Sequence, residues 1–171
     1  MATLIVFGGL PGTGKTSIAK EVARRSVAAY LRIDVIEQAI RQASGLGADV
    51  GPVGYEVGYA LAEANLALGR IVVADSVNPV ASTRDGWRQV AARTSVPLLE
   101  VEIVCSDTAE HRRRVDARRS DIAGLALPVW EAVVARDYEP WLDASLRVDT
   151  ATMPVSESAR LIVEAIGQKT G

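Results

Sequence analysis

The sequence has little cysteine, few aromatic residues and no long apolar run. Cys105 is its only cysteine, so no internal disulfide can form, and a reducing cytoplasm is the expected compartment. No apolar run approaches the ~20 residues that a membrane-spanning helix needs, and no basic residue precedes the first apolar run. We therefore expect neither a membrane segment nor a secretion signal. The 19 basic and 21 acidic residues nearly balance, which disfavours a nucleic-acid partner because such proteins usually carry a basic surplus.

The remaining composition is that of an ordinary globular domain. The chain has 171 residues, 49% of them apolar and 23% charged, which suffices for a single domain over residues 1–171 with its own core. Nearly continuous apolar runs alternate with helical patterns, which is typical of an α/β fold with a parallel sheet. The predicted strands are residues 4–7, 30–33, 71–74, 98–104 and 146–148. The predicted helices are residues 15–26, 34–42, 55–68, 82–93, 108–119, 129–138 and 155–166.

A phosphate-binding motif follows the first predicted strand. Its residues read G-x-x-x-x-G-K-T and are Gly9, Leu10, Pro11, Gly12, Thr13, Gly14, Lys15 and Thr16. The strand before it and the helix after it are the context that a P-loop requires. Glycines let successive N–H groups point at phosphate oxygens, and the helix N-terminus adds partial positive charge. We expect these residues and Ser17 to bind a nucleotide, with Lys15 at the β- and γ-phosphates and Thr16 on Mg²⁺.

Acidic residues follow the next two predicted strands. Asp34 comes after the second strand and Asp75 after the third, and such strand ends meet at the crevice where parallel sheets bind ligands. Asp75 is suited to bind Mg²⁺, directly or through water. Asp34 is suited to orient or deprotonate an acceptor hydroxyl in line with the γ-phosphate. Each also suits a plainer role, Asp75 as the cap of a turn or helix and Asp34 as the N-cap of the next helix.

Two absences narrow the class of nucleotide-binding protein. The sequence has no Asn-Lys-x-Asp motif for reading guanine, which favours ATP as the cofactor. The third strand ends in Asp75-Ser76 instead of the Asp-Glu pair of large AAA-type motors, and the chain is short for such a motor.

Arginines cluster in the predicted helix 108–119. Arg114 and Arg118 are four residues apart and therefore share a helix face. We predict that no acidic residue lies in local reach on that face, so that both guanidiniums are free to bind phosphate. Arg112 and Arg119, in contrast, are both within reach of Asp116 and are expected to pair with it. The alternative is a solvated charged face; Arg136, on the next helix, is a weaker candidate.

One stretch resists regular structure. Residues 43–58 hold five of the 14 glycines, and such a composition favours a loop. It is either a plain solvent loop or a mobile flap that binds the acceptor, because it lies at the mouth of the second strand–helix unit.

Taken together, these motifs resemble the small P-loop kinases of the nucleoside-monophosphate-kinase type. The chain looks most similar to the kinases known as AAA-family ATPases and to chloramphenicol phosphotransferase-like and zeta-toxin-like proteins. The resemblance is carried by the P-loop, by Asp34, by Arg114 and Arg118 in an R-x-x-x-R…G-x-A pattern, and by Asp149 in the segment 148–150. It implies a five-stranded parallel sheet of order 2-3-1-4-5 with helices on both faces, a small helical lid at about residues 112–136, and Asp149 beside the adenine.

The position three residues after Asp34 departs from this family. Related nucleotide kinases commonly have an arginine there, which holds the phosphate of the acceptor, whereas this sequence has Glu37. A carboxylate repels a phosphate, so a neutral or cationic small molecule with a hydroxyl is the expected acceptor.

The sequence therefore predicts an ATP- and Mg²⁺-dependent phosphotransferase. Its catalytic residues would be Lys15, Asp34, Arg114 and Arg118, with Thr16 and Asp75 at the metal. The alternatives are a nucleoside or polynucleotide-end kinase and, in another class, an ATP-dependent switch with slow ATPase activity.

Overall fold

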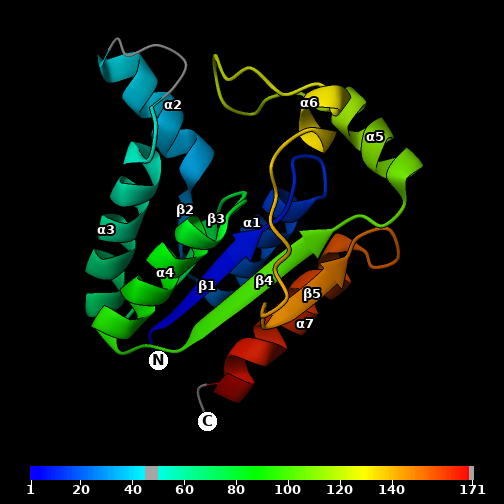
Figure 1. The fold of residues 1–171 in the computed structure, drawn as a ribbon. Coiled ribbons are helices and arrows are strands. Elements are labelled where there is room, and N and C mark those ends of the chain that lie inside the picture. Colours follow the sequence, from blue (N-terminus) through cyan, green and yellow to red (C-terminus); the bar gives the residue numbers. More distant parts are fainter. Residues whose placement is uncertain (45–49, 170–171) are drawn as a thin grey trace.

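The computed structural model describes residues 1–44 and 50–169, which form one sheet of five parallel strands (Figure 1). The strands are β1 (Thr3–Gly8), β2 (Ala29–Arg32), β3 (Ile71–Asp75), β4 (Leu98–Val104) and β5 (Leu146–Asp149). They lie in the order β2-β3-β1-β4-β5, and every neighbouring pair is parallel. The α/β fold class and the strand order implied by the family resemblance are confirmed.

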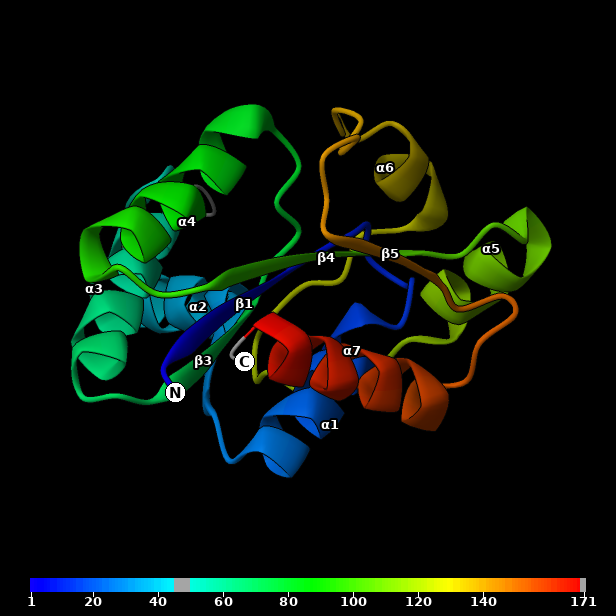
Figure 2. The ribbon, with the colours of Figure 1, turned by 90° about the horizontal axis from the view of Figure 1, so that it is seen from below.

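The described residues also form seven helices. They are α1 (Lys15–Ser26), α2 (Ile33–Ser44), α3 (Val53–Ala67), α4 (Ala81–Thr94), α5 (Thr108–Ala117), α6 (Trp130–Val134) and α7 (Val155–Lys169). In Figure 2 the sheet is seen nearly edge-on, with α1 and α7 on one face and α3 and α4 on the other. No helix in this described part of the chain is long and apolar enough to cross a membrane.

The core lies on both faces of the sheet, because successive residues of a strand point to opposite sides. In β1, Ile5 and Phe7 pack in the cluster that α1 and α7 cover, whereas Leu4 and Val6 pack in the cluster that α3 and α4 cover. All four side chains have 0% exposure. This double burial explains why the predicted strands read as continuous apolar runs. Because β1, β2 and β3 run parallel, their carboxyl ends lie at one edge of the sheet, where the candidate site lies.

Residues 53–58 close the glycine-rich stretch predicted to be irregular, but they begin α3, so the predicted helix 55–68 is present and starts two residues earlier. Two glycines lie there because the helix packs closely against its neighbours. A Cβ atom at Gly54 would come within 2.3 Å of the Glu37 side chain, and one at Gly58 within 2.5 Å of Ile33. Close packing therefore outweighs the low helix propensity of glycine. Residues 43 and 44 end α2, and residues 45–49 of the predicted flap lie outside the described residues.

The predicted lid, residues 112–136, is helical only in part. It comprises the second half of α5, an irregular stretch and the short helix α6. α5 ends at Ala117, two residues before the predicted end, because Arg118 has an extended backbone with φ −62° and ψ 140°.

Candidate active site

The loop between β1 and α1 has the backbone that its glycines make possible. Gly9, Gly12 and Gly14 have φ angles of 139°, 85° and 92°, in the region that side chains other than glycine rarely adopt. A Cβ atom at Gly9 would lie 2.2 Å from the carbonyl oxygen of Ile103, and one at Gly12 would lie 2.5 Å from a methyl group of Val115. The loop therefore tolerates no side chain at these two positions.

This loop and the start of α1 line a cavity of about 210 Å³, here called the phosphate cavity. Its lining residues are Leu10, Pro11, Gly12, Gly14, Lys15, Thr16, Ser17, Arg114 and Arg118. α1 has no acidic residue in its first turn, so the first N–H groups and the positive end of the helix dipole favour an anion. Gly9 and Thr13, also predicted to bind the nucleotide, line a neighbouring cavity instead. They shape the loop, since the Gly9 N–H donates to the Val77 carbonyl at 3.0 Å.

Lys15 and Asp75 form a buried ion pair at the centre of the site. Lys15 Nζ donates to Asp75 Oδ1 at 3.0 Å, and the two side chains are 8% and 1% exposed. The Tyr30 hydroxyl donates to the other carboxylate oxygen at 2.7 Å. Burial raises the pKa of Asp75, but Lys15 and the hydroxyls of Tyr30 and Thr16 outweigh it and hold the pKa below its usual range. Asp75 thus remains a carboxylate and lies beside Thr16.

A second cavity of about 270 Å³, here called the acceptor cavity, adjoins the first. Pro11, Lys15 and Arg118 line both cavities, and Asp34 lines the second. Asp34 is the second residue of α2 and its side chain is 37% exposed, so it does not cap the helix as the plainer interpretation required. The structure brings Asp34, Lys15 and Arg118 into one cavity.

The acceptor cavity contains charges of both signs around Glu37. Arg41 donates to Glu37 at 3.2 Å, and Arg136 lines the same cavity. Burial raises the pKa of Glu37, and the two arginines oppose this shift. The repulsion that Glu37 was expected to exert on an anionic acceptor is therefore partly offset.

Arg32, at the end of β2, is a site residue that the sequence analysis missed. Its side chain is 5% exposed, and Nη1 donates to the two carboxylate oxygens of Asp121 at 2.8 and 2.9 Å. Its guanidinium also lies 3.7 Å from the Asp34 carboxylate and 3.9 Å from that of Asp75. A charged residue that ends an apolar strand was the available signal, because arginine is rarely buried unless it is paired.

The prediction that Arg114 has no acidic residue in reach is wrong. Glu110 lies one helical turn earlier, and Arg114 Nε donates to it at 2.7 Å. Arg114 also donates to the hydroxyl of Thr150 at 2.8 Å and to its carbonyl at 3.1 Å. These bonds fix the guanidinium between α5 and the loop after β5, where it still lines the phosphate cavity.

The early end of α5 changes the expected arginine pairs. Arg118 does not share a helix face with Arg114, although both line the phosphate cavity. Arg112 lies 3.7 Å from Asp116 as predicted. The predicted pair between Arg119 and Asp116 is absent from the ion pairs of the described residues, because the helix ends before Arg119.

The Asp149 carboxylate accepts hydrogen bonds from the backbone of two neighbouring loops. Its Oδ1 accepts from the N–H groups of Ser106 and Ala151, both at 3.0 Å. The side chain of Ser106, together with these two N–H groups, holds the pKa of Asp149 below its usual range. The carboxylate therefore ties the loop after β5 to the loop after β4. It does not line the phosphate cavity, and its predicted place beside the adenine stays a prediction.

A family model described as an AAA domain matches residues 4–136. The chain belongs to this AAA domain family. The matched region of the AAA domain contains the phosphate-binding loop, Asp34, Asp75 and the arginines of α5, and it ends at Arg136 in the acceptor cavity. No curated protein matches the chain.

Solved structures with the same fold include several kinases. The Mycobacterium tuberculosis APS kinase CysC, in complex with AMPPNP and APS, has a TM-score of 0.71 and 20% identity, over 97% of this chain and 98% of that chain. A gluconokinase from Sinorhizobium meliloti 1021 has a TM-score of 0.63 and 18% identity, over 99% and 98%. Chaetomium thermophilum Kti12, in complex with ADP-AlF3, has a TM-score of 0.72 and 21% identity, over 98% and 99%. At these identities, the comparison establishes the P-loop fold of the AAA domain.

The side chains at the loop suit a Mg²⁺–nucleotide complex. The described residues hold no cluster of three or more His, Cys, Asp or Glu side chains that could bind a metal alone. Mg²⁺ is commonly held by one or two protein oxygens together with substrate phosphates. The hydroxyl of Thr16 and the carboxylate of Asp75 are oxygen ligands of that kind, and the Thr16 hydroxyl is one of the groups that lower the pKa of Asp75.

Proposed function

We propose that the protein transfers the γ-phosphoryl group of ATP to a hydroxyl of a small polar acceptor. The observation that carries this proposal is the shared boundary of the two cavities. Lys15 and Arg118 line both of them, and Asp34 lies in the second. A phosphate held on the loop and a hydroxyl held at Asp34 would therefore meet beside two cations. The kinase folds of the solved relatives support the same reaction class.

Each residue has a definite role in this reaction. Lys15 and the loop N–H groups bind the phosphates, with Lys15 leaving Asp75 when the nucleotide binds. Thr16 and Asp75 would hold Mg²⁺, which when bound would supply positive charge at the phosphate oxygens. Asp34 accepts a hydrogen bond from the acceptor hydroxyl, orients it and takes its proton as the new O–Pγ bond forms and the bond from Pγ to the ADP oxygen breaks. Arg118 stabilises the charge that spreads over the transferred group, and Arg114 anchors the nucleotide against the loop after β5.

The acceptor cavity favours a polyhydroxylated or zwitterionic molecule over a strongly anionic one. Apart from Lys15 and Arg118, which serve the phosphates, its charged side chains are Asp34, Glu37, Arg41 and Arg136. Their formal charges sum to zero. Carboxylates and guanidiniums together can hydrogen-bond several hydroxyl groups, whereas a polynucleotide end would need a basic path that these side chains do not supply.

The first test is ADP release from Mg–ATP across sugars, amino alcohols, antibiotics, nucleosides and short oligonucleotides, with Lys15→Ala as the blank. We expect one small-molecule class to accelerate release. The Asp34→Asn variant should keep its ATP affinity and lose at least about a hundredfold in transfer, the usual contribution of an acid–base group. Transfer at the wild-type rate in Asp34→Asn would contradict the role of Asp34. Release that no acceptor changes would favour the switch.

A further inference from the structure

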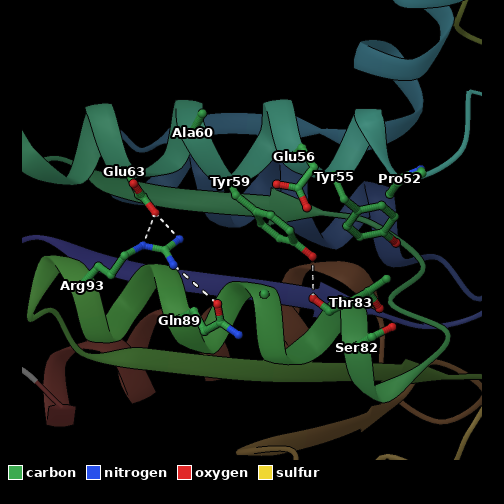
Figure 3. Close-up of a pocket in the computed structure, with 11 residues that line it drawn as sticks. Pro52, Tyr55, Glu56, Tyr59, Ala60, Glu63, Ser82, Thr83, Gln89 and Arg93 are labelled. Carbon is green, nitrogen blue, oxygen red and sulfur yellow. Dashed lines mark hydrogen bonds and ion pairs between the residues drawn. The ribbon is translucent and has the colours of Figure 1, made fainter.

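A groove of about 500 Å³ lies between α3 and α4, outside the acceptor cavity. Figure 3 shows the side chains that line it, with Tyr59 reaching from α3 to the start of α4. The Tyr59 hydroxyl donates to the carbonyl of Thr83 at 2.8 Å. A Cβ atom at Gly86 would lie 2.3 Å from the Tyr59 ring, so the absence of a side chain there lets the ring lie directly against α4. The floor of the groove is therefore a fixed aromatic surface.

The groove and the acceptor cavity share one wall. Tyr55 lines both of them, and its hydroxyl accepts from the N–H of Asn78 at 3.1 Å, which holds the ring in place. The two spaces therefore meet at the Tyr55 side chain. An acceptor whose hydroxyl lies at Asp34 would have to pass the edge of this ring to reach the groove, which requires a molecule larger than one sugar ring.

The charge of the groove favours a cation. Glu63 is already paired with Arg93, which donates to it from both Nε and Nη2, as the dashed lines in Figure 3 indicate. Glu56 lies two helical turns before Glu63 in α3 and lines the same groove. Among the hydrogen bonds and ion pairs of the described residues, none involves the Glu56 carboxylate. Its neighbours in the groove are the rings of Tyr55 and Tyr59, whose centroids are 6.1 Å apart.

An uncompensated carboxylate beside two aromatic rings is a recognised environment for an ammonium group, because both the charge and the ring faces attract a cation. We propose that the α3–α4 groove binds an ammonium group of the acceptor, next to Glu56, while the acceptor's hydroxyl lies at Asp34. This inference rests on the proposed phosphotransferase function and specifies its substrate class as amino sugars or similar amino alcohols of more than one ring.

Titration calorimetry with neamine, a two-ring amino sugar, tests the groove without turnover. The neutral disaccharide trehalose serves as the control ligand. Glu56→Gln should weaken neamine binding by about tenfold or more, as expected for the loss of one charged contact. Glu157→Gln is the matched control variant, because it removes the same charge from an exposed position in α7 on the opposite face of the sheet. Its neamine affinity should stay within about twofold of the wild type.

Two results would overturn the groove assignment. One is no neamine binding to the wild-type protein, or binding no tighter than that of trehalose. The other is equal affinity in Glu56→Gln and Glu157→Gln. Tyr59→Leu, which removes an aromatic face without changing charge, should also weaken binding; unchanged binding would exclude the ring from the site.

Measuring neamine-stimulated ADP release in the same proteins separates the two proposals. Binding that depends on Glu56 without any phosphoryl transfer would leave the ammonium site standing and refute the proposed reaction. Transfer to neamine that does not depend on Glu56 would support the reaction and refute the groove. If both hold, Glu56→Gln raises the KM for neamine by about tenfold and leaves kcat nearly unchanged, because Glu56 lies away from the reacting atoms.

Discussion

The charge of Asp75 is the most informative single feature to remove. Asp75→Asn keeps the shape of the side chain but takes away the carboxylate that lies between Lys15 Nζ, at 3.0 Å, and Arg32 Nε, at 3.9 Å. Both cations are almost fully buried, with side chains 8% and 5% exposed. The substitution therefore leaves two desolvated cations near each other with no carboxylate between them.

The loss of stability in Asp75→Asn depends on which other partners Lys15 and Arg32 can still contact. Removing one partner of a buried ion pair costs about 3–5 kcal/mol. We expect the lower end, about 3 kcal/mol, because Lys15 also lines the phosphate cavity and can turn toward water there, and Arg32 keeps Asp121. For a protein of this size each kcal/mol shifts the Tm by about 2–4 °C. The Tm of Asp75→Asn should therefore fall by about 6–12 °C.

Thermal unfolding followed by circular dichroism measures this loss. Asp85→Asn is the control, because Asp85 is 55% exposed and pairs with Arg88 at the surface, where ion pairs contribute about 0–1 kcal/mol. Inorganic phosphate adds a second readout. It should stabilise Asp75→Asn more than the wild type, since Lys15 in the variant gains an anion without giving up a carboxylate. A Tm loss under about 2 °C, or the same phosphate response in both proteins, would refute the reasoning.

Two further predictions concern the lid. Arg118→Ala should lower kcat for ADP release more than it weakens ATP binding, whereas Arg114→Ala should chiefly weaken ATP binding. Steady-state kinetics measure kcat and equilibrium binding measures the ATP affinity of both variants. Equal effects of the two substitutions on kcat and on ATP affinity would contradict the assigned roles. Lys20 and Arg32 hold the pKa of Asp121 below its usual range. The stability from Asp121 should therefore be complete above the unfolded pKa of about 4 and be lost as the pH falls below it. The difference in urea midpoint between wild type and Asp121→Asn should shrink between about pH 5 and pH 3; a constant difference would exclude the ion pairs.

The parts of the fold that follow from local pattern could be predicted from the sequence. The strands are continuous apolar runs because both faces of the sheet are covered, and the phosphate-binding loop has a motif whose glycines are fixed by backbone geometry. The strand order could not be obtained in this way. A strand that is apolar on both faces carries no pattern that selects its neighbour, so the order came from the family resemblance alone.

Helix boundaries failed where packing outweighs composition. The glycines of residues 53–58 favoured a loop, although the helical pattern begins at residue 55. Gly54 and Gly58 are the positions at which α3 packs most closely against side chains of α2 and α4. Glu110, in contrast, was visible in the sequence at four residues before Arg114. An acidic residue four positions before an arginine shares its helix face just as one four positions after it does, so Glu110 pairs with Arg114 and the guanidinium is not free.

The main partner of Arg32 could not have been identified from any local window, although the place of Arg32 at the end of an apolar strand was a signal. Its main partner, Asp121, is 89 residues away, and the other carboxylates come from α2 and β3. Burying a guanidinium is costly unless it is paired, and Asp121 supplies that pairing from the irregular stretch of the lid. Arg32 in turn stabilises the two site carboxylates. Asp34 and Asp75 are like charges at neighbouring strand ends, and a cation between them offsets their repulsion. The lid residue Asp121 therefore contributes to the charge balance of a site that it does not line, through one buried arginine.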